Sequence, residues 1–517
     1  MSNWEDQLYT HGFLLTDDKE ILSKNIGIKW ESWTVNKLGK YEMYSHPNQK
    51  VNWLKKNNTF IVLVGHAYNP FSNEYSETDI LKKLSDSYGT DSYCDYFDEL
   101  TGLFFYAVIE NDIITANTDC AGLLGAYYAK INGNVYFSAY SQMIADLFGL
   151  DEDPYVTKIK KSKLFHLYGW FLPGDMSPYK EVRRIIPNTE IKYEDEFICH
   201  RFYPRKNYSI NGSDEEYRRN LENICGILHN SMSLITKKWE RPAISLTGGM
   251  DSQTTLACAK DLQKKFGYFS YVSLEREETD ANAAHRICES KGLNHKIYLI
   301  ETDKTKLSEF EEVNNLVRRH YSYLGYGNEN DICKRICLKK YLDIDIEVKS
   351  WVSEVARASR YKMYGKKKLP KSLTPRLLTT MYKVFIFNRK DAIETDKMFQ
   401  QYIDYTKLKD TLEKFNYPWS EFFVWEIVFG GWGSLALTGE HSLTNDITVP
   451  YNNRALLDMM LRTPLQYRID DRLNKDIIEF MDKQLYDLEI HVVNGNETFA
   501  REMFEKIYFN IHSKLPW

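Results

Sequence analysis

The chain has no long hydrophobic run, no leader-like start and no surplus of basic residues. Its longest apolar stretches, such as 60–64 and 103–109, have the length of a strand and are far too short to span a bilayer. The amino terminus has neither a basic region nor an apolar core, so we expect no signal peptide. These absences favour a cytoplasmic protein with no membrane partner.

The charge balance argues against nucleic acid as a partner. The 72 acidic residues outnumber the 67 basic ones, which gives a formal net charge of −5. A global basic field is therefore absent, and we expect no nucleic-acid partner. The Lys-rich stretch 362–371 is a local exception, which either contacts an anionic substrate or forms a solvated loop.

Cysteine is sparse, with eight residues scattered through 517. Cys333 and Cys337 are four apart on an expected helix, which is the spacing of half a metal site. No second pair of ligands lies nearby, and the histidines also lack ligand spacing, so we expect buried free thiols and no zinc.

What is present is an ordinary globular composition, with 43% hydrophobic and 27% charged residues. The first 200 residues contain short β-branched and aromatic runs between turn residues, such as 60–64 and 134–139. A polar joint with Pro and Gly follows at 203–213. We therefore predict two domains, 1–205 and 206–517.

Beyond the joint the pattern changes to alternating strands and helices. Ser213 precedes three acidic residues and is expected to cap a helix that runs to about Lys238. We then expect strands at 241–246, 268–274 and 295–300, and helices at 252–265 and 280–291. This alternation predicts an α/β fold with a doubly wound parallel sheet. The remainder, from about 305, reads as largely helical.

The most informative segment joins the first of these strands to the helix after it. It reads Ala-Ile-Ser-Leu-Thr-Gly-Gly-Met-Asp-Ser over 243–252. Gly248 and Gly249 let backbone N–H groups approach an anion, and the helix start adds partial positive charge. Thr247 and Ser252 add hydroxyl donors. The segment matches neither G-x-x-x-x-G-K-[ST] nor G-x-G-x-x-G, and its simpler interpretation is a turn.

Taken whole, the string Thr247-Gly-Gly-Met-Asp-Ser252 resembles the S-G-G-x-D-S pyrophosphate loop of the ATP pyrophosphatases, which cleave ATP to AMP and pyrophosphate. The resemblance implies ATP and Mg²⁺ as cofactors, with the magnesium held by Asp251. We assign to nucleotide binding eight residues of this half that lie in the loop or after the next strand: Ser245, Leu246, Thr247, Gly248, Gly249, Asp251, Ser252 and Ser273.

Within that group the chain resembles the asparagine synthetase family, whose amino-terminal part is a class II glutamine amidotransferase domain. Four strings carry this resemblance, and they begin at Val64, Glu77, Phe97 and Asp119. It implies an N-terminal αββα domain of the Ntn type. The family's catalytic Cys is replaced by Ser2, a nucleophile only in principle.

Three further replacements fall on residues that grip glutamine in the family. His66 stands for a Glu and Val64 for an Asn, while the family's Asp is Glu77 here. We therefore expect this domain to be a relic without glutaminase activity, as in the relatives that make β-lactams or cyclise lasso peptides.

Three other motifs depart further from the family. The stretch 350–358 is placed on its second synthetase loop, with Glu354 as catalytic acid and Arg357 as a phosphate partner, or as an ordinary i,i+3 pair. Lys475 matches the family's active-site Lys, or is a surface lysine. The Gly/Trp-rich string 425–434 either lines the acceptor pocket, with Glu426 as a base, or connects helices.

The resemblance implies an AMP-forming ligase that adenylates a small-molecule, peptide or sugar carboxylate and passes the acyl group to ammonia or a substrate amine. Two alternatives stay open. The first is glutamine-dependent asparagine synthesis, which glutamate release would reveal. The second is a non-catalytic binding protein with this fold, which pyrophosphate release would exclude. A homodimer is compatible with the sequence.

Overall fold

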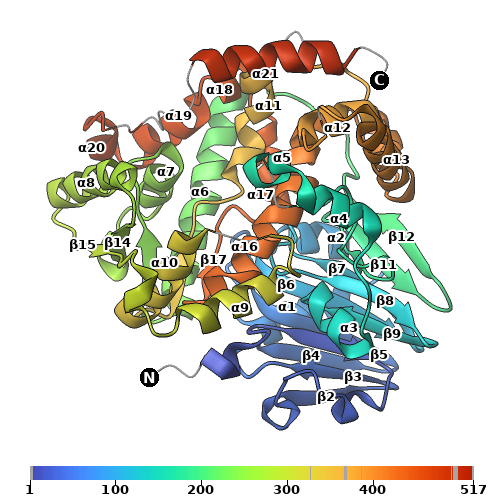
Figure 1. The fold of residues 1–517 in the computed structure, drawn as a ribbon. Coiled ribbons are helices and arrows are strands. Elements are labelled where there is room, and N and C mark those ends of the chain that lie inside the picture. Colours follow the sequence, from blue (N-terminus) through green and yellow to red (C-terminus); the bar gives the residue numbers. More distant parts are fainter. Residues whose placement is uncertain are drawn as a thin grey trace.

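The computed structural model describes residues 4–168, 171–325, 328–365, 369–385, 387–490, 492 and 499–514. Ser2 and the lysines at 366–368 lie outside the described residues. Figure 1 shows the amino-terminal sheets below and to the right of the long central helix, with the parallel sheet at its other side.

The amino-terminal half is built on two six-stranded antiparallel sheets. One has the order β10-β8-β9-β1-β3-β2, with bounds Arg183–Arg184, Tyr127–Ile131, Asn134–Ser138, Phe13–Thr16, Tyr41–Ser45 and Thr34–Leu38. The other has the order β12-β11-β7-β6-β5-β4, with bounds Phe197–Arg201, Thr189–Tyr193, Ile113–Thr118, Thr101–Glu110, Thr59–Tyr68 and Val51–Lys56.

Burial on both faces explains the continuous apolar run at 60–64. Val62 and Val64 pack into the core between the two sheets. Ile61 and Leu63, whose side chains point the opposite way along the strand, pack under α1 (Glu77–Ser87) and α2 (Asp91–Asp98). With α3 (Ser141–Phe148) against the other sheet, the layers run helix, sheet, sheet, helix, so the predicted αββα architecture is confirmed.

The second half contains the predicted parallel sheet, in the order β15-β14-β13-β16-β17. The strands are Pro242–Ser245 for β13, Gly267–Val272 for β14, His295–Leu299 for β15, Ile346–Val348 for β16 and Ile447–Thr448 for β17. The chain leaves β13 toward β14 and β15, then returns to add β16 on the other side. Such a reversal of strand order places a crevice at the carboxyl ends of the strands, where α/β proteins bind ligands.

Helices make up the rest of the second half, as predicted. The sheet is accompanied by α6 (Asp214–Lys238), α7 (Met250–Cys258), α8 (Glu275–Ser290), α9 (Phe310–His320) and α10 (Glu329–Tyr341). The later helices are α11 (Ser359–Tyr364), α12 (Pro375–Tyr382), α13 (Arg389–Tyr405), α14 (Leu408–Lys414), α15 (Trp419–Phe422), α16 (Ser434–Gly439), α17 (Arg454–Leu461), α18 (Leu465–Ile469), α19 (Arg472–Met481), α20 (Lys483–Tyr486) and α21 (Phe499–His512).

The remaining elements are short. Two helices of the first half, α4 (Pro154–Lys161) and α5 (Lys163–Tyr168), pack into the core of the second half. Single turns of 3-10 helix are η1 (Trp4–Gln7), η2 (Ile21–Ser23), η3 (Trp30–Ser32), η4 (Gln263–Lys265), η5 (Lys304–Lys306), η6 (Ser353–Arg357) and η8 (His441–Leu443).

Two expected helix bounds were wrong. The helix after the loop ends at Cys258 and not at Lys265, because the chain turns at 259–262 before η4. The next helix begins at Glu275, five residues before the expected start. The side chain of Glu277 accepts hydrogen bonds from the backbone N–H groups of Ser273 and Leu274, and these bonds cap the earlier start.

One buried helical run is longer than the apolar stretches of the sequence suggest. Trp419–Leu443 spans 25 residues and is apolar and long enough to cross a membrane, yet 89% of its apolar part is buried in the protein. It joins α15 to α16 through the π-helical segment η7 (Phe423–Gly433). The run therefore serves as a core helix of the described structure.

The two halves meet across buried polar residues. Glu426 of η7 is fully buried, and its two carboxylate oxygens lie 2.6 and 2.9 Å from the guanidinium of Arg201. Tyr402 and Asn188 donate further hydrogen bonds to it, at 2.7 and 3.0 Å. Because every oxygen is occupied by these partners, Glu426 joins the halves and is not the base of an acceptor pocket.

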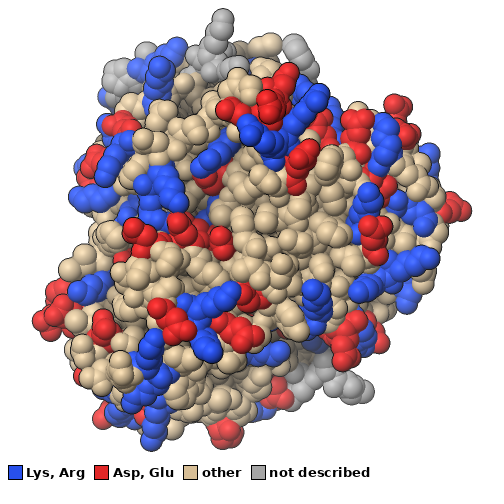
Figure 2. Space-filling view, turned by 180° about the vertical axis from the view of Figure 1, so that it is seen from behind, with Lys and Arg blue, Asp and Glu red and all other residues tan. Residues whose placement is uncertain are grey.

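A second buried joint connects the string that begins at Asp119 with the segment 449–454. The Asp119 carboxylate accepts bonds from three backbone N–H groups and from Asn452, at 2.8 Å. Arg454, 1% exposed, donates to the carbonyl oxygens of Thr118 and Asp119. The segment 449–454 thus locks the second half onto the end of β7. On the surface, Figure 2 shows acidic and basic side chains interspersed over one face.

Candidate functional site

A cavity of about 330 Å³ opens at the carboxyl ends of β13, β14 and β16, where the strand order reverses. This volume lies in the range of about 300–1,000 Å³ that is typical of small-molecule sites. The predicted residues that line it are Ser245, Leu246, Thr247, Asp251, Ser252 and Glu354. The structure therefore brings the loop and the Glu354 segment, more than 100 positions apart in sequence, to one site.

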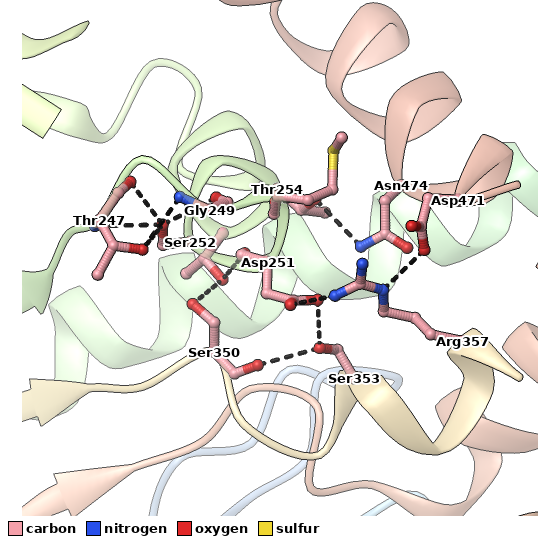
Figure 3. A network of polar contacts seen from close by, with 12 residues as sticks. Thr247, Gly249, Asp251, Ser252, Thr254, Ser350, Ser353, Arg357, Asp471 and Asn474 are labelled. Atoms are coloured by element: carbon pink, nitrogen blue, oxygen red, sulfur yellow. Dashed lines mark hydrogen bonds and ion pairs between the residues drawn. The ribbon is translucent and has the colours of Figure 1, made fainter. Parts of the chain in front are cut away.

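The loop curls back on the first turn of α7. The Ser252 hydroxyl is 3.0 Å from the Thr247 hydroxyl and donates to the backbone oxygens of Thr247 and Gly249. Gly249 is the N-cap, and its N–H donates to the Thr247 hydroxyl at 3.2 Å (Figure 3). A Cβ at Gly248 would lie only 2.4 Å from Val492, so this glycine is needed for a close packing contact.

Asp251 begins a chain of charges that Figure 3 shows in close-up. One of its carboxylate oxygens accepts from the Ser353 hydroxyl at 2.8 Å, and the other is ion-paired with Arg357. Arg357 also contacts Asp471 at 2.8 Å, and Lys362 contacts the same Asp471 oxygen at 2.6 Å. Arg357 therefore reaches the loop through Asp251, although it does not itself line the cavity.

Glu354 has the least satisfied carboxylate of the site. Its Oε2 is buried and has no hydrogen-bond partner among the described residues. Burial raises the pKa of its carboxyl to about 7, and the nearby Asp251 carboxylate adds to the shift. Val352, two residues earlier, has φ 76°, a left-handed conformation that a β-branched residue seldom adopts. The surrounding fold holds this strained turn against the loop.

Two acidic residues of α8 complete the acidic wall. Asp280 and Glu277 are three apart on the helix and both line the cavity. Burial raises the pKa of Asp280, and a hydrogen bond from the backbone N–H of Gly248 partly offsets that rise. Ser273 lies outside the lining and instead donates to Glu277 at 2.8 Å through both its N–H and its hydroxyl. Its contact with the site is therefore indirect.

Lys475 lies outside the cavity lining. It is exposed on α19, and its ammonium donates to the backbone oxygen of Asp470 at 3.3 Å. Its neighbour Asp471 belongs to the charge chain of Arg357 and Lys362. The role of Lys475 stays a prediction, while Lys362 is the lysine that this structure joins to Asp251 through Asp471 and Arg357.

Sequence reasoning missed several residues that face the cavity. Lys349 follows β16 directly and precedes the stretch 350–358 that the sequence placed at the site, whose Ser350 and Trp351 also line the cavity. The sequence signal that could have found Lys349 is a polar residue directly after a buried strand. His441 comes from η8, nearly 200 positions beyond the loop, and carries no local signal.

A second cavity of about 480 Å³ adjoins the first, and the two share the lining residues Tyr271, Trp351 and His441. Its wall includes Val428 and Trp432 from the Gly/Trp-rich string. The expectation that this string faces a pocket is therefore met by Trp432 and not by Glu426.

A separate cavity of about 340 Å³ lies between the halves, around the residues that stand where the family grips glutamine. Gly65, His66 and Glu77 line it, whereas Val64 is buried in the core between the sheets. Glu77 is paired with Lys238 at 2.6 Å and also accepts from the N–H of Ala67. Burial lowers the pKa of His66 to about 3, with Lys238 adding to the shift, so this ring is neutral.

The side chains of the site fit Mg²⁺ only if phosphate oxygens of a bound nucleotide supply further ligands. The described residues contain no group of three His, Cys, Asp or Glu side chains able to hold a metal by themselves. Magnesium is commonly held by one or two carboxylates together with substrate phosphates. Asp251 lies at the loop that would receive phosphates. Its carboxylate would hold Mg²⁺ in place of its present ion pair with Arg357.

No protein-family model matches the chain. No curated protein matches it in sequence. Among solved structures it is similar to an allosteric regulatory enzyme of purine biosynthesis, at 12% identity and a TM-score of 0.24, over 47% of this chain and 56% of that one. It is also similar to the glutamine phosphoribosylpyrophosphate amidotransferase of B. subtilis complexed with ADP and GMP, at 9% identity and a TM-score of 0.21, over 69% and 72%.

Proposed function

We propose that this chain is an ATP-dependent, AMP-forming ligase of the asparagine synthetase type, which joins a carboxylate to an amine. The observation that most supports this is the loop Thr247–Ser252, folded onto the start of α7 at the reversal of the parallel sheet, with a cavity before it. Backbone N–H groups and a helix start are suited to phosphate binding.

The chemistry needs two steps. A carboxylate oxygen of the substrate attacks the α-phosphorus of ATP, the bond from that phosphorus to its bridging oxygen breaks, and pyrophosphate leaves. The amine nitrogen then attacks the acyl carbon, the carbon–oxygen bond to AMP breaks, and one proton leaves the nitrogen. Activation is needed because a free carboxylate is a poor electrophile.

The residues of the site have distinct parts in this scheme. The loop would bind pyrophosphate through N–H groups near Gly248 and Gly249, in exchange for their present hydrogen bonds to Asp280 and to the Thr247 hydroxyl. Bound Mg²⁺, held by Asp251 and phosphate oxygens, would neutralise phosphate charge. With Asp251 as the residue that would hold the metal, Arg357 would be free to turn its guanidinium toward the phosphates and would keep its contact with Asp471. Glu354, whose pKa lies near neutrality, would accept the proton of the amine.

The amino-terminal half would contribute structure and no ammonia. The family's gripping Asn is replaced by Val64, which is buried in the sheet core, and Glu77 is neutralised by Lys238. We therefore propose free ammonia or a substrate amine as acceptor. We also propose a cytoplasmic location.

The direct test is exchange of labelled pyrophosphate into ATP with a broad panel of carboxylic acids. At least one acid should support exchange, and Asp251→Ala should abolish it. Absence of exchange with every acid, together with an unchanged Asp251→Ala variant, would mean that the chain is a binding protein. Release of glutamate from glutamine would instead favour the asparagine synthetase alternative.

A further inference from the structure

The second cavity is too large for a small acceptor alone and has an apolar floor. Its 480 Å³ compares with about 30 Å³ for a water-sized molecule such as ammonia. From Trp419 to Glu440, every side chain of the long core helix is buried except Val428 and Trp432. These two are four residues apart and both line the cavity, so the one accessible stripe of this helix is its wall.

Flat aromatic surface forms one part of the cavity lining, which also includes the charged residues Asp331, Lys334, Arg335 and Glu440. Trp351 and Trp432 are stacked, with ring centroids 4.9 Å apart and planes inclined by 23°. Both residues line the cavity, and Trp432 has no other ring or cation contact among the described residues, whereas the Lys349 ammonium lies 5.9 Å from the Trp351 ring centroid. Phe171 and Leu167 extend the apolar lining, and Leu167 is 66% exposed. An apolar ligand with a flat ring would bury this surface.

The junction between the two cavities is polar. His441, which lines both, lies 3.1 Å from the guanidinium of Arg335 through its Nδ1. A guanidinium only donates, so Nδ1 accepts and the proton of the neutral ring is on Nε2. No described residue accepts a hydrogen bond from that Nε2. Burial, with Arg335, Lys349 and Lys334 nearby, lowers the pKa of His441 well below its usual value, which keeps the ring neutral.

Lys349 lies at the same junction and is almost fully buried. Its ammonium is paired with Glu347 at 2.6 Å, which uses one of its three N–H donors. The neutral N–H of His441 and the buried ammonium of Lys349 both line the loop cavity. Together they supply hydrogen-bond donors for one carboxylate. A carboxylate placed there would lie at the mouth of the loop cavity.

We propose that the second cavity binds the acid substrate, and that this acid carries a flat apolar ring seated on Trp432 and Trp351 and a carboxylate held by His441 and Lys349. The inference rests on the proposed ligase function for its chemistry, but binding of the acid alone does not require ATP. It excludes aspartate as the preferred substrate, because aspartate would leave the aromatic wall uncovered.

Binding is measured without nucleotide, by ligand-observed NMR and calorimetry, with hydrocinnamate as probe and aspartate and acetate as comparisons. We expect hydrocinnamate to bind and the two small acids to bind at least tenfold more weakly. Trp432→Leu should weaken hydrocinnamate about tenfold, whereas Trp53→Leu, at an exposed Trp of β4, should change nothing. Tighter binding of aspartate, or equal effects of the two Trp variants, would overturn the inference.

The carboxylate contact is tested by two variants at one position. His441→Gln keeps an N–H donor and should retain affinity, while His441→Phe keeps a ring and should lose about tenfold. Equal affinity in His441→Phe and the native chain would remove His441 from the site. Melting curves of each variant check that the fold is kept.

MgATP binding, measured separately on the same samples, distinguishes the two proposals. Binding of hydrocinnamate without any binding of MgATP would refute the ligase function and leave the acid site standing. Binding of MgATP without hydrocinnamate would refute the acid site alone.

Discussion

Buried polar side chains are fully hydrogen-bonded at the joint between the halves, whereas some of those at the loop cavity lack partners. At the joint, Glu426 and Asp119 each have every oxygen bonded by protein donors. At the cavity, Glu354 keeps an enclosed oxygen with no described partner, and the Nε2–H of His441 has no described acceptor. Buried polar groups with every partner present hold a structure together, whereas unsatisfied ones beside a cavity indicate a ligand.

The cavity between the halves resembles the joint in having ion pairs within the protein. Glu77 is paired with Lys238, and His11 contacts Asp446 at 3.2 Å. The lining side chains Glu77, Lys238, His11 and Asp446 are thus paired within the protein, whereas the buried Nε2 of the neutral His66 ring has no partner among the described residues. The four variants below test this contrast, beginning with the largest effect.

Breaking the joint should have the largest effect. Arg201→Leu leaves the Glu426 carboxylate buried without its cation, and we expect the free energy of unfolding to fall by about 3–5 kcal/mol. Denaturant titration measures this. Arg219→Leu, at an exposed position of α6, is the matched control and should change it by less than about 0.5 kcal/mol. A small effect of Arg201→Leu would mean that the joint is not what holds the halves together.

Removal of the Asp251 carboxylate should have the second largest effect. Asp251→Asn removes the proposed magnesium ligand with almost no change in shape, and we expect carboxylate-dependent pyrophosphate exchange to fall about a hundredfold. Asp261→Asn, an exposed residue of the same half with φ 64°, removes the same charge away from the site and should leave exchange unchanged. Equal rates in the two variants would take Asp251 out of the mechanism.

Glu354 predicts a pH dependence of stability. The pKa of this acid is raised in the folded chain, to about 7, so the folded state loses stability as pH rises from the ordinary Glu value through that pKa. Glu354→Gln has no carboxylate to ionise and should lack this loss. The variant should therefore gain at least about 1 kcal/mol over the native chain between pH 5 and pH 8 in magnesium-free melting curves. A difference independent of pH would show that Glu354 is satisfied in the fold.

The smallest effect is expected at the cavity between the halves. The double variant Glu77→Gln with Lys238→Met removes a paired charge from its lining and should cost about 1 kcal/mol of stability. Pyrophosphate exchange should stay at the native rate, because no step is assigned to this cavity. A strong loss of exchange with an intact melting curve would show that the amino-terminal half takes part in catalysis.

Local patterns predicted the parts of the fold that local sequence controls. The strands around 242–245 and 267–272 and the helix from Asp214 to Lys238 agree with the structure, whereas the αββα layers were expected from the family resemblance and not from local patterns. The Gly-Gly string could be assigned to a strand-to-helix turn because its glycines, hydroxyls and acid all lie within six residues.

Contacts between distant segments were harder to predict. Glu426 lies in an apolar Gly/Trp string that faces a cavity, but the wide η7 helix turns its carboxylate to Arg201, 225 positions earlier. His441 and Lys349 reach the site only because β16 and β17 join the sheet beside β13. A single sequence contains no local signal for such pairings.

We propose that the chain cleaves ATP between its α- and β-phosphates to activate an acid. Phosphorus NMR of the products formed from ATP, Mg²⁺, an acid that supports exchange and an amine tests it most directly. We predict AMP and pyrophosphate in equal amounts, formed only when the acid is present and lost in Asp251→Asn. Formation of ADP and phosphate, or no cleavage with any acid, would contradict the account.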